Sequence, residues 1–501
     1  MLLPRQRLFI ILASLLALFL SALDTLVMGA AMPTIVADLG GLHLYSWAFS
    51  GYMLARAVSL PIFGKLADIF TNRRLYVFSI GIFLAGSLMA GLADSMAGLT
   101  LSRVVQGIGA GGNFALVYIV LSDISPPERR GKMMSLASFV WGLASVLGPT
   151  VGGVVVSYVS WRWIFFVNIP LGGLSLIGIL RYLDETREKR AAVSIDYWGA
   201  LSLSTAILSL LTAFMLGGQR YPWISAPVLS LFALFAAAGI GFYFAERRAE
   251  DPILSFDFFR KPAFALGNGA VLGASLVIFP VTAFMPLFVQ GALGKTPAEL
   301  GLVMMFLSLG WSVGALFCGQ TVNRLGERPA ALIGAVSLIA GSWMTAGFSA
   351  QTAFSVCAVA MVIAGVGMGF VSISTLLIVQ NSVGVADLGV ATSAHQFTRT
   401  LGGTVGIGIA GSLLTARFIE TTDRLMESGT AGMIPPEILT VLRDNVENLF
   451  KPEIQAALAP AVRGALQGAM GESVVAIFRG ISIAALFCLV AAYFLPGDRR
   501  R

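Results

Sequence analysis

The chain has 501 residues, of which 57% are hydrophobic and only 12% are charged, and its mean hydropathy is +0.84. Because soluble domains carry about 25% charged residues, this composition excludes a water-soluble globular protein and predicts a polytopic membrane protein. The net charge of +7 does not indicate a nucleic-acid-binding surface, since the Lys and Arg residues are spread over the gaps between apolar runs.

In chain order, the apolar runs of about 20 residues that can cross a bilayer as helices number about fourteen. The predicted spans are 8–32, 45–64, 75–94, 97–122, 133–158, 163–182, 197–216, 226–245, 263–290, 300–320, 329–348, 354–379, 388–415 and 474–495. These runs predict an all-α integral membrane protein. Three cysteines, Cys318, Cys357 and Cys488, lie inside apolar runs without metal-binding spacing, and we interpret them as small packing residues.

The first span begins after Arg5 and Arg7, as a signal peptide would, but its apolar run is long and no cleavage site follows it closely. We therefore expect it to be retained. It contains one acid, Asp24, at a depth where a charge is costly to keep. Either Asp24 hydrogen-bonds to a neighbouring helix as a packing residue, or it is a proton- or cation-binding carboxylate that lines a polar cavity.

Most Lys and Arg residues fall in alternate loops. The short loops of the other set hold only Arg162, Arg220 and Lys295. By the positive-inside rule, this asymmetry predicts that both termini lie in the cytoplasm and that the chain is integral to the plasma membrane, which in a bacterium is the inner membrane.

An internal repeat relates two loops. GKLADIFTNRR (64–74) aligns with GQTVNRLGERP (319–329) at a constant offset of 255 residues, the difference between Gly64 and Gly319. This offset exceeds the length of six spans with their loops, of about 200 residues, by about two helices. We predict two pseudo-symmetric six-helix bundles with two helices inserted between them. Paired repeats around a central site are the usual arrangement of secondary transporters. The predicted units are 1–190, 191–262 and 263–501.

The last unit contains a segment, 418–472, that is not predicted to lie in the membrane and that falls on the extracytoplasmic side. Within it, residues 438–450 show the periodicity of an amphipathic helix. We interpret it as a helical hairpin that packs on the outer mouth, or as a lid or docking segment for a periplasmic or extracellular partner.

The 64–74 loop joins the second and third predicted spans. An acid at a helix end that faces basic side chains can hold two helices together and release them on opening. The candidate residues of this latch are Gly64, Asp68, Arg73 and Arg74. The alternative is that the charges of this loop only set the topology.

Three further motifs lie inside predicted spans. SRVVQGIGAGG (102–112) places Arg103 in the outer half of its span, where it either snorkels to the interface or forms a charge relay with Asp24. GLASVLGPTVGG (142–153) combines a proline, which removes a backbone hydrogen bond, with glycines that allow close helix packing. Its candidate residues are Gly142, Gly148, Pro149, Gly152 and Gly153. SALDTLVMGAAMPTI (21–35) surrounds Asp24.

These four motifs resemble those of the major facilitator superfamily, specifically its fourteen-span drug:proton antiporter branch, and the resemblance covers nearly all of the chain apart from the outer segment. It implies that 64–74 is a cytoplasmic latch, that 142–153 is the motif typical of exporters, and that Asp24 and Arg103 couple transport to protons. Thr71 departs from the pattern, since it stands where the family usually has glycine.

Two more arginines lie inside spans. Arg56 lies at a depth similar to that of Asp24, so an ion pair between them is one interpretation, because an unpaired charge in the membrane is costly. Arg399 matches an arginine often seen in the penultimate span of the resembling branch, where it would contact substrate or hold the gate. His395, one turn earlier, is interpreted as a packing or hydrogen-bonded residue.

Methionine and aromatic residues indicate where a substrate would pass. Met28 is the candidate in the first span, and an adaptable apolar wall is predicted from Phe284, Met285, Phe288 and Met304. The same side chains are also compatible with a position facing lipid.

We expect a proton-coupled exporter, an antiporter of hydrophobic or amphipathic small molecules that works by alternating access. The alternative is an exporter or flippase of a lipid or other dedicated metabolite. An enzyme is not expected, because no nucleophile–base set, clustered histidines or paired acids appear at membrane depth. No phosphate-binding motif GxxxxGK[ST] occurs, so the expected energy source is the proton gradient, without cofactor or metal and without nucleic-acid partner.

Overall fold

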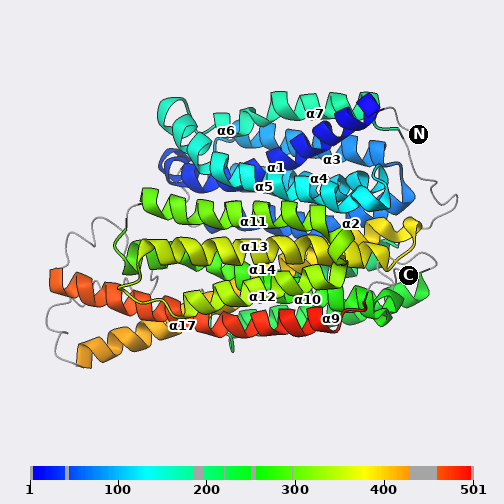
Figure 1. Ribbon diagram of the computed structural model, residues 1–501. Helices are drawn as coiled ribbons and strands as arrows, with labels where there is room; N and C mark the ends of the chain where they lie inside the picture. Colours follow the sequence, from blue (N-terminus) through cyan, green and yellow to red (C-terminus); the bar gives the residue numbers. More distant parts are fainter. Residues whose placement is uncertain are drawn as a thin grey trace.

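The structure is a computed structural model that describes residues 4–39, 45–184, 196–218, 221–249, 256–295, 297–427 and 460–497. All elements of this part of the chain are helices (Figure 1). Those of the first half are α1 (Pro4–Leu39), α2 (Tyr45–Ile69), α3 (Asn72–Gly91), α4 (Met96–Asp123), α5 (Pro127–Tyr158), α6 (Trp163–Phe166) and α7 (Asn168–Tyr182). Next come α8 (Tyr197–Leu216), α9 (Ala226–Arg248) and the 3₁₀ turn η2 (Phe256–Arg260). The remainder are α10 (Pro262–Pro286), the π-helical turn η3 (Leu287–Ala292), α11 (Pro297–Leu325), α12 (Glu327–Ala346), α13 (Phe354–Asn381), η4 (Val385–Asp387), α14 (Leu388–Glu427) and α17 (Pro460–Tyr493).

The helices follow from the apolar runs, since a backbone inside hydrocarbon must satisfy its hydrogen bonds within each segment. Among the described residues, twelve helices are long and apolar enough to cross a membrane, with α6 and α7 counted as one. The other two predicted spans fall on α2 and α5, which are 25 and 32 residues long. Both pack against the second half of the chain. The all-α membrane fold is therefore as predicted.

The two halves repeat one set of helix contacts. In the first half, α4 packs on α2 and α3, while α1 packs on α5 and α7. In the second half, α13 packs on α11 and α12, while α10 packs on α14 and α17. Each helix pair of the first half therefore has a counterpart in the second, as the 255-residue offset predicts.

The most extensive contacts between the halves are those of α2 with α14 and of α5 with α11, and smaller ones join α4 to α14 and α5 to α13. The glycines of the repeat lie at the two larger contacts. A Cβ on Gly64 would collide with Ser393 on α14, and a Cβ on Gly319 would lie 2.7 Å from the Cβ of Ser135 on α5. The repeat therefore places a glycine at a close approach in each of these pairs. These contacts lie toward the end of the bundle at which α1 begins and α17 ends, hereafter the terminal end (Figure 1).

Thr71 departs from the family pattern without backbone strain. It precedes α3 with φ −64° and ψ 131°, which any residue adopts. The equivalent position in the repeat is Gly326, which has φ 90° and therefore requires glycine.

Of the two inserted helices, α8 contacts both halves. α8 packs on α9, on α2 and on α14. One cluster of buried apolar residues joins Leu54 and Ala57 of α2 to Ile207 and Leu211 of α8, with Phe397 of α14 packed against it. The inserted pair therefore borders the contact between α2 and α14.

The segment at 418–472 is described only at its two ends, where the candidate membrane spans stop at Phe418 and resume at Gln467. α14 continues to Glu427 and α17 begins at Pro460, so both helices extend beyond the bundle at the end opposite the termini (Figure 1). The predicted amphipathic helix at 438–450 lies outside the described residues. The boundaries of the three predicted units stay predictions.

Candidate functional site

Asp24 and Arg103 form an ion pair inside the first half. Arg103 Nη1 donates to Asp24 Oδ2 at 2.5 Å, and the two side chains are 1% and 2% exposed. The sequence places both residues in the outer halves of α1 and α4, and the packing of these helices brings them together. Arg103 therefore does not snorkel to the interface, and the predicted contact with Asp24 is present.

Amide donors hold the second oxygen of Asp24. Gln106 Nε2 donates to Asp24 Oδ1 at 2.8 Å, and Gln106 Oε1 accepts from Arg103 Nη1 at 2.6 Å. Asn168 Nδ2, on α7, lies 3.3 Å from the same Asp24 oxygen. Ser87 Oγ, on α3, accepts from Asn168 at 2.9 Å and from Gln106 at 3.2 Å. We call Asp24, Ser87, Arg103, Gln106 and Asn168 the acid network. Arg103, Gln106 and Asn168 all direct N–H donors at the Asp24 carboxylate.

Aromatic rings cover the guanidinium of this network. Arg103 Cζ lies 4.2 Å from the ring centroid of Tyr52 on α2 and 5.8 Å from that of Phe165. The Tyr52 hydroxyl donates to the carbonyl oxygen of Ser21 at 3.3 Å and accepts from Thr25 at 3.3 Å. Side chains from α1, α2, α3, α4, α6 and α7 thus converge on one charged pair.

The sequence pattern alone does not indicate a role for Gln106, Asn168, Ser87 or Tyr52. Gln106 lies in the quoted motif three residues after Arg103, which places it on the same face of α4. Asn168 is a lone amide in an apolar run, and such residues in spans face polar partners. Ser87 and Tyr52 carry no signal that distinguishes them from other serines and tyrosines in spans.

Arg56 does not pair with Asp24. Its Cζ lies 4.3 Å from the ring centroid of Phe114 on α4 and 5.4 Å from that of Trp141 on α5. Arg399 on α14 approaches the same Phe114 ring at 5.3 Å. His395 Nε2 lies 2.9 Å from Thr375 Oγ1, so His395 is hydrogen-bonded, as interpreted from the sequence.

The latch loop contacts α14 through Asp68. Its Oδ1 accepts from the backbone N–H of Gly389 at 3.0 Å, and its Oδ2 accepts from that of Val390 at 3.0 Å. A carboxylate at the first amides of a helix is stabilised by the helix dipole. Arg73 and Arg74, at the start of α3, have exposed side chains. Asp68 therefore joins the two halves at the terminal end.

The 142–153 motif lies on α5, between α1 and α11. A Cβ on Gly142 would collide with Ser312 of α11, and one on Gly148 would lie 2.8 Å from Leu26 of α1. Gly152 is buried. Pro149 and Gly153 belong to the same helix, but their surroundings fall outside the described part of the chain. The motif therefore lets α5 approach both halves closely.

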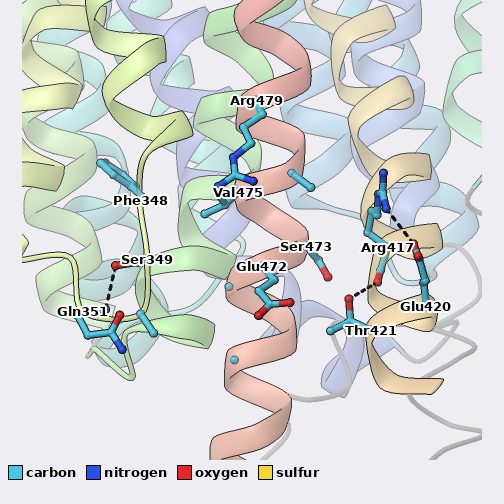
Figure 2. A pocket seen from close by; sticks show the side chains of 14 residues that line it. Phe348, Ser349, Gln351, Arg417, Glu420, Thr421, Glu472, Ser473, Val475 and Arg479 are labelled. Atoms are coloured by element: carbon cyan, nitrogen blue, oxygen red, sulfur yellow. Dashed lines mark hydrogen bonds and ion pairs between the residues drawn. The ribbon is translucent and has the colours of Figure 1, made fainter. Parts of the chain in front are cut away.

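A cavity of about 750 Å³ opens at the end of the bundle opposite the termini (Figure 2). The α12–α13 loop, α14 and α17 line it. Charged side chains from two of these helices face it, with an exposed pair between Arg417 and Glu420 at 2.9 Å, and Glu472 and Arg479 on α17. It belongs to the second half alone.

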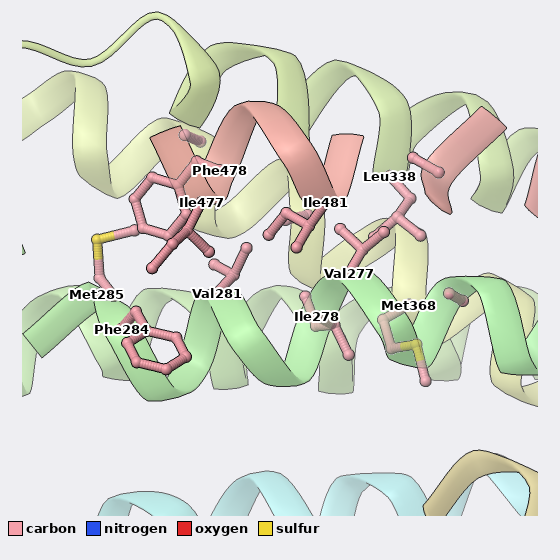
Figure 3. Close-up of a cluster of buried hydrophobic side chains, with 14 of the residues drawn as sticks. Val277, Ile278, Val281, Phe284, Met285, Leu338, Met368, Ile477, Phe478 and Ile481 are labelled. Carbon is pink, nitrogen blue, oxygen red and sulfur yellow. The ribbon is translucent and has the colours of Figure 1, made fainter. Parts of the chain in front are cut away.

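Most residues of the predicted methionine-rich wall are core residues. Phe284 and Met285 are 8% and 0% exposed and pack in the second half, where α10 faces α17 (Figure 3). Phe288, on η3, is 0% exposed in the same cluster. Met28 is 0% exposed in a cluster with Leu23 and Val27. The position facing lipid is therefore wrong for these four. The three cysteines are free and buried, and no group of His, Cys, Asp and Glu in the described ranges could hold a metal ion.

Comparisons with known proteins agree with this architecture. A family model described as Major Facilitator Superfamily matches residues 14–407. Multidrug resistance protein 3 of Bacillus subtilis is 33% identical over 482 residues, which covers 91% of this chain and 94% of that protein. Multidrug transporter protein MdtP of Bacillus subtilis is 32% identical, with coverage of 97% and 93%.

Among solved structures, the human organic anion transporter MFSD10 superposes with a TM-score of 0.63 at 14% identity, over 96% of this chain and 100% of that one. At that identity the likeness shows the fold alone. The family match and the two bacterial relatives carry the assignment: the chain belongs to the major facilitator superfamily and is an integral membrane transporter, not an enzyme.

Proposed function

We propose that the protein exports hydrophobic or amphipathic small molecules across the plasma membrane in exchange for protons, and that Asp24 is the proton carrier. The names of the two Bacillus subtilis relatives, both called multidrug proteins, support the substrate class. The common side of the termini and the positive-inside rule support a cytoplasmic location for the terminal end.

The single observation that carries the proposal is the position of Asp24. Among the described residues, the buried acids are Asp24, Asp68 and Glu246. Asp68 and Glu246 lie near the ends of α2 and α9, whereas Asp24 lies in the middle of α1. An ionisable acid deep in a span is costly to bury, and such residues therefore mark proton or ion pathways in membrane proteins.

The geometry supplies a way to use that charge. A proton that binds Asp24 removes the counter-charge of Arg103 and leaves a buried cation without its partner. The acid network must then rearrange, and because its members come from several helices of the first half, a rearrangement changes their packing. Protonation would in this way bias the two halves between their open arrangements, which is the requirement for alternating access.

Proton movement in proteoliposomes tests the proposal. The purified full chain is reconstituted, a pH gradient is imposed, and amphipathic cations, anions and neutral compounds are added in turn. We expect substrate-triggered proton flux in the wild type and none in Asp24→Asn. Asp38→Asn serves as the matched control, since Asp38 is an acid of the same helix with a side chain 49% exposed.

Flux that persists in Asp24→Asn would exclude Asp24 as the carrier. If neither the wild type nor the control responds to any compound of the panel, proton-coupled export of such molecules is wrong, and lipid transport becomes the function to test, with labelled phospholipid as the probe.

A further inference from the structure

A second charged cluster lies where the two halves meet. Arg56 on α2 and Arg399 on α14 approach the ring of Phe114 at 4.3 and 5.3 Å. Their guanidinium groups are close enough to repel each other. At a helical rise of about 1.5 Å per residue, Arg56 lies about 18 Å along α2 from Asp68, and Arg399 lies about 15 Å along α14 from Gly389. The two arginines are therefore level with each other, deep inside the bundle.

Neither arginine has a counter-ion among the described residues. Within the described ranges, no carboxylate lies at ion-pair distance from Arg56 or Arg399, and Asp24 is already engaged by Arg103. Arg56 is nonetheless only 8% exposed. Burying a charge costs several kcal/mol, and a cation–π contact returns only about 0.5–2 kcal/mol. The cluster thus holds excess positive charge.

The surroundings of the two arginines are apolar and aromatic. The Phe114 ring packs edge-on against Trp141 at 6.0 Å and against Tyr118 at 5.4 Å. The Tyr118 hydroxyl interacts with Arg399. His395, one turn before Arg399 on α14, is 0% exposed and its Nδ1 has no partner in the described structure. Hydrogen-bond donors and flat apolar surfaces therefore occur together.

We propose that Arg56 and Arg399 bind the acidic group of an amphipathic organic anion, a carboxylate or sulfonate on an aromatic or apolar body, and that such anions are a substrate class of this transporter. The inference rests on the proposed function and specifies its substrate. Arginine suits the task, since its planar donors match the oxygens of a carboxylate and its face stacks on rings.

The position of the site connects binding to the approach of the halves. Without a ligand, like charges on α2 and α14 oppose that approach. An anion that contacts both arginines replaces repulsion with two attractions, so it binds more tightly to the arrangement in which the halves are close. A lipophilic cation gains nothing here, because both arginines repel it.

Ligand binding to the purified full chain in detergent tests the inference without any gradient. The probes are pyrenebutyrate, its neutral alcohol pyrenebutanol and a pyrene alkylammonium of the same length, and binding is followed by energy transfer from tryptophan to pyrene. We expect the wild type to bind the carboxylate about tenfold or more tightly than the alcohol, the effect of one hydrogen bond to a charged group. Arg56→Gln and Arg399→Gln should each remove most of this preference, and Arg399→Lys should retain part of it.

Arg260→Gln is the matched control, since Arg260 has a side chain 81% exposed outside the cluster. If a Gln variant fails to fold, the wild-type preference for carboxylate over alcohol still decides. Equal affinity for carboxylate and alcohol, tighter binding of the ammonium probe, or a preference unchanged in folded Gln variants would each overturn the inference. If only the anion site is wrong, neutral or cationic compounds still drive proton flux in proteoliposomes. If the purified protein prefers the carboxylate but no compound drives proton flux, only the proposed antiport is refuted.

Discussion

Arg103 and Arg56 are both buried in the first half of the chain, and they differ in what surrounds the guanidinium. Arg103 has an acid and an amide oxygen within 2.6 Å and a tyrosine ring below it. Arg56 has two aromatic rings and a second arginine nearby. Arg103 is neutralised by Asp24 within the first half. No described residue neutralises the charges of Arg56 and Arg399 where the two halves meet. The proposals above assign the balanced pair to proton transfer and the unbalanced arginines to anion binding.

Truncating the two arginines should have opposite effects on stability, and this is the largest effect we expect. Arg103→Leu leaves the buried Asp24 without its cation, which should destabilise the fold by about 3–5 kcal/mol. Arg56→Leu removes an unpaired buried charge, so it should be neutral or stabilising by about 1–4 kcal/mol. Thermal unfolding of both variants in one detergent measures the difference.

Asp24→Asn combined with Arg103→Leu provides the control, since it removes both charges and should recover part of the loss. Equal decreases in melting temperature for the two single variants would mean that another group balances the charge of Arg56, and would contradict the comparison.

The contact between α2 and α14 contains both an unbalanced and a balanced charge. Among the described side chains, Arg56 and Arg399 are unbalanced deep in the bundle, whereas the Asp68 carboxylate is hydrogen-bonded at the terminal end. Asp68→Asn places an amide N–H against a backbone donor, which should cost the closed end about 1–2 kcal/mol. Such a loss raises the open population about 5–30-fold. Ser135→Cys, buried under Gly319 in the α5–α11 contact, reports opening through its labelling rate with a water-soluble maleimide.

The labelling rate should therefore rise by the same factor in the Asp68→Asn background and stay at the wild-type level in the Asp38→Asn background. The native cysteines give little background, since all three are buried. An unchanged rate in Asp68→Asn would mean that this carboxylate does not hold the terminal end closed.

The smallest expected effect concerns the exposed ion pair between Asp38 and Arg162, which contrasts with the buried pair of Asp24 and Arg103. The pKa of Asp38, outside the apolar part of α1, is lowered first by the hydrogen bond from Trp161 Nε1 and then by that from Arg162, at 3.0 and 2.8 Å. A carboxyl whose pKa is lower in the folded state contributes stability above its unfolded pKa and loses it as the pH falls through the folded value. The contribution is small because the pair is exposed.

The melting temperatures of the wild type and Asp38→Asn should therefore differ slightly at neutral pH and converge as the pH drops below about 4. Unfolding scans across this range measure the gap. A gap that widens with acid would contradict the assigned sign.

Individual residues show which side-chain contacts could be predicted from the sequence. The depth of Asp24 and Arg103, counted from the ends of their apolar runs, was sufficient to predict that they could meet. The same depth argument also allowed Asp24 to pair with Arg56, and that pairing is wrong. Depth follows from counting residues, but the direction in which a side chain leaves a helix depends on how that helix is rotated against its neighbours. Asn168 was missed for the same reason, since its target lies on another helix.

The number of helices, the common side of the termini, the repeat and the acid inside the first span follow from the sequence by itself. The physical reason is that a membrane forces every apolar run of sufficient length into a helix, because the backbone has no other hydrogen-bonding partner there. Only the tertiary structure decided that Arg103 balances Asp24, that Asp68 meets the first amides of α14, and that Arg56 and Arg399 share one ring across the two halves. These contacts depend on close packing between helices far apart in the chain, which rests on the shapes of many side chains at once.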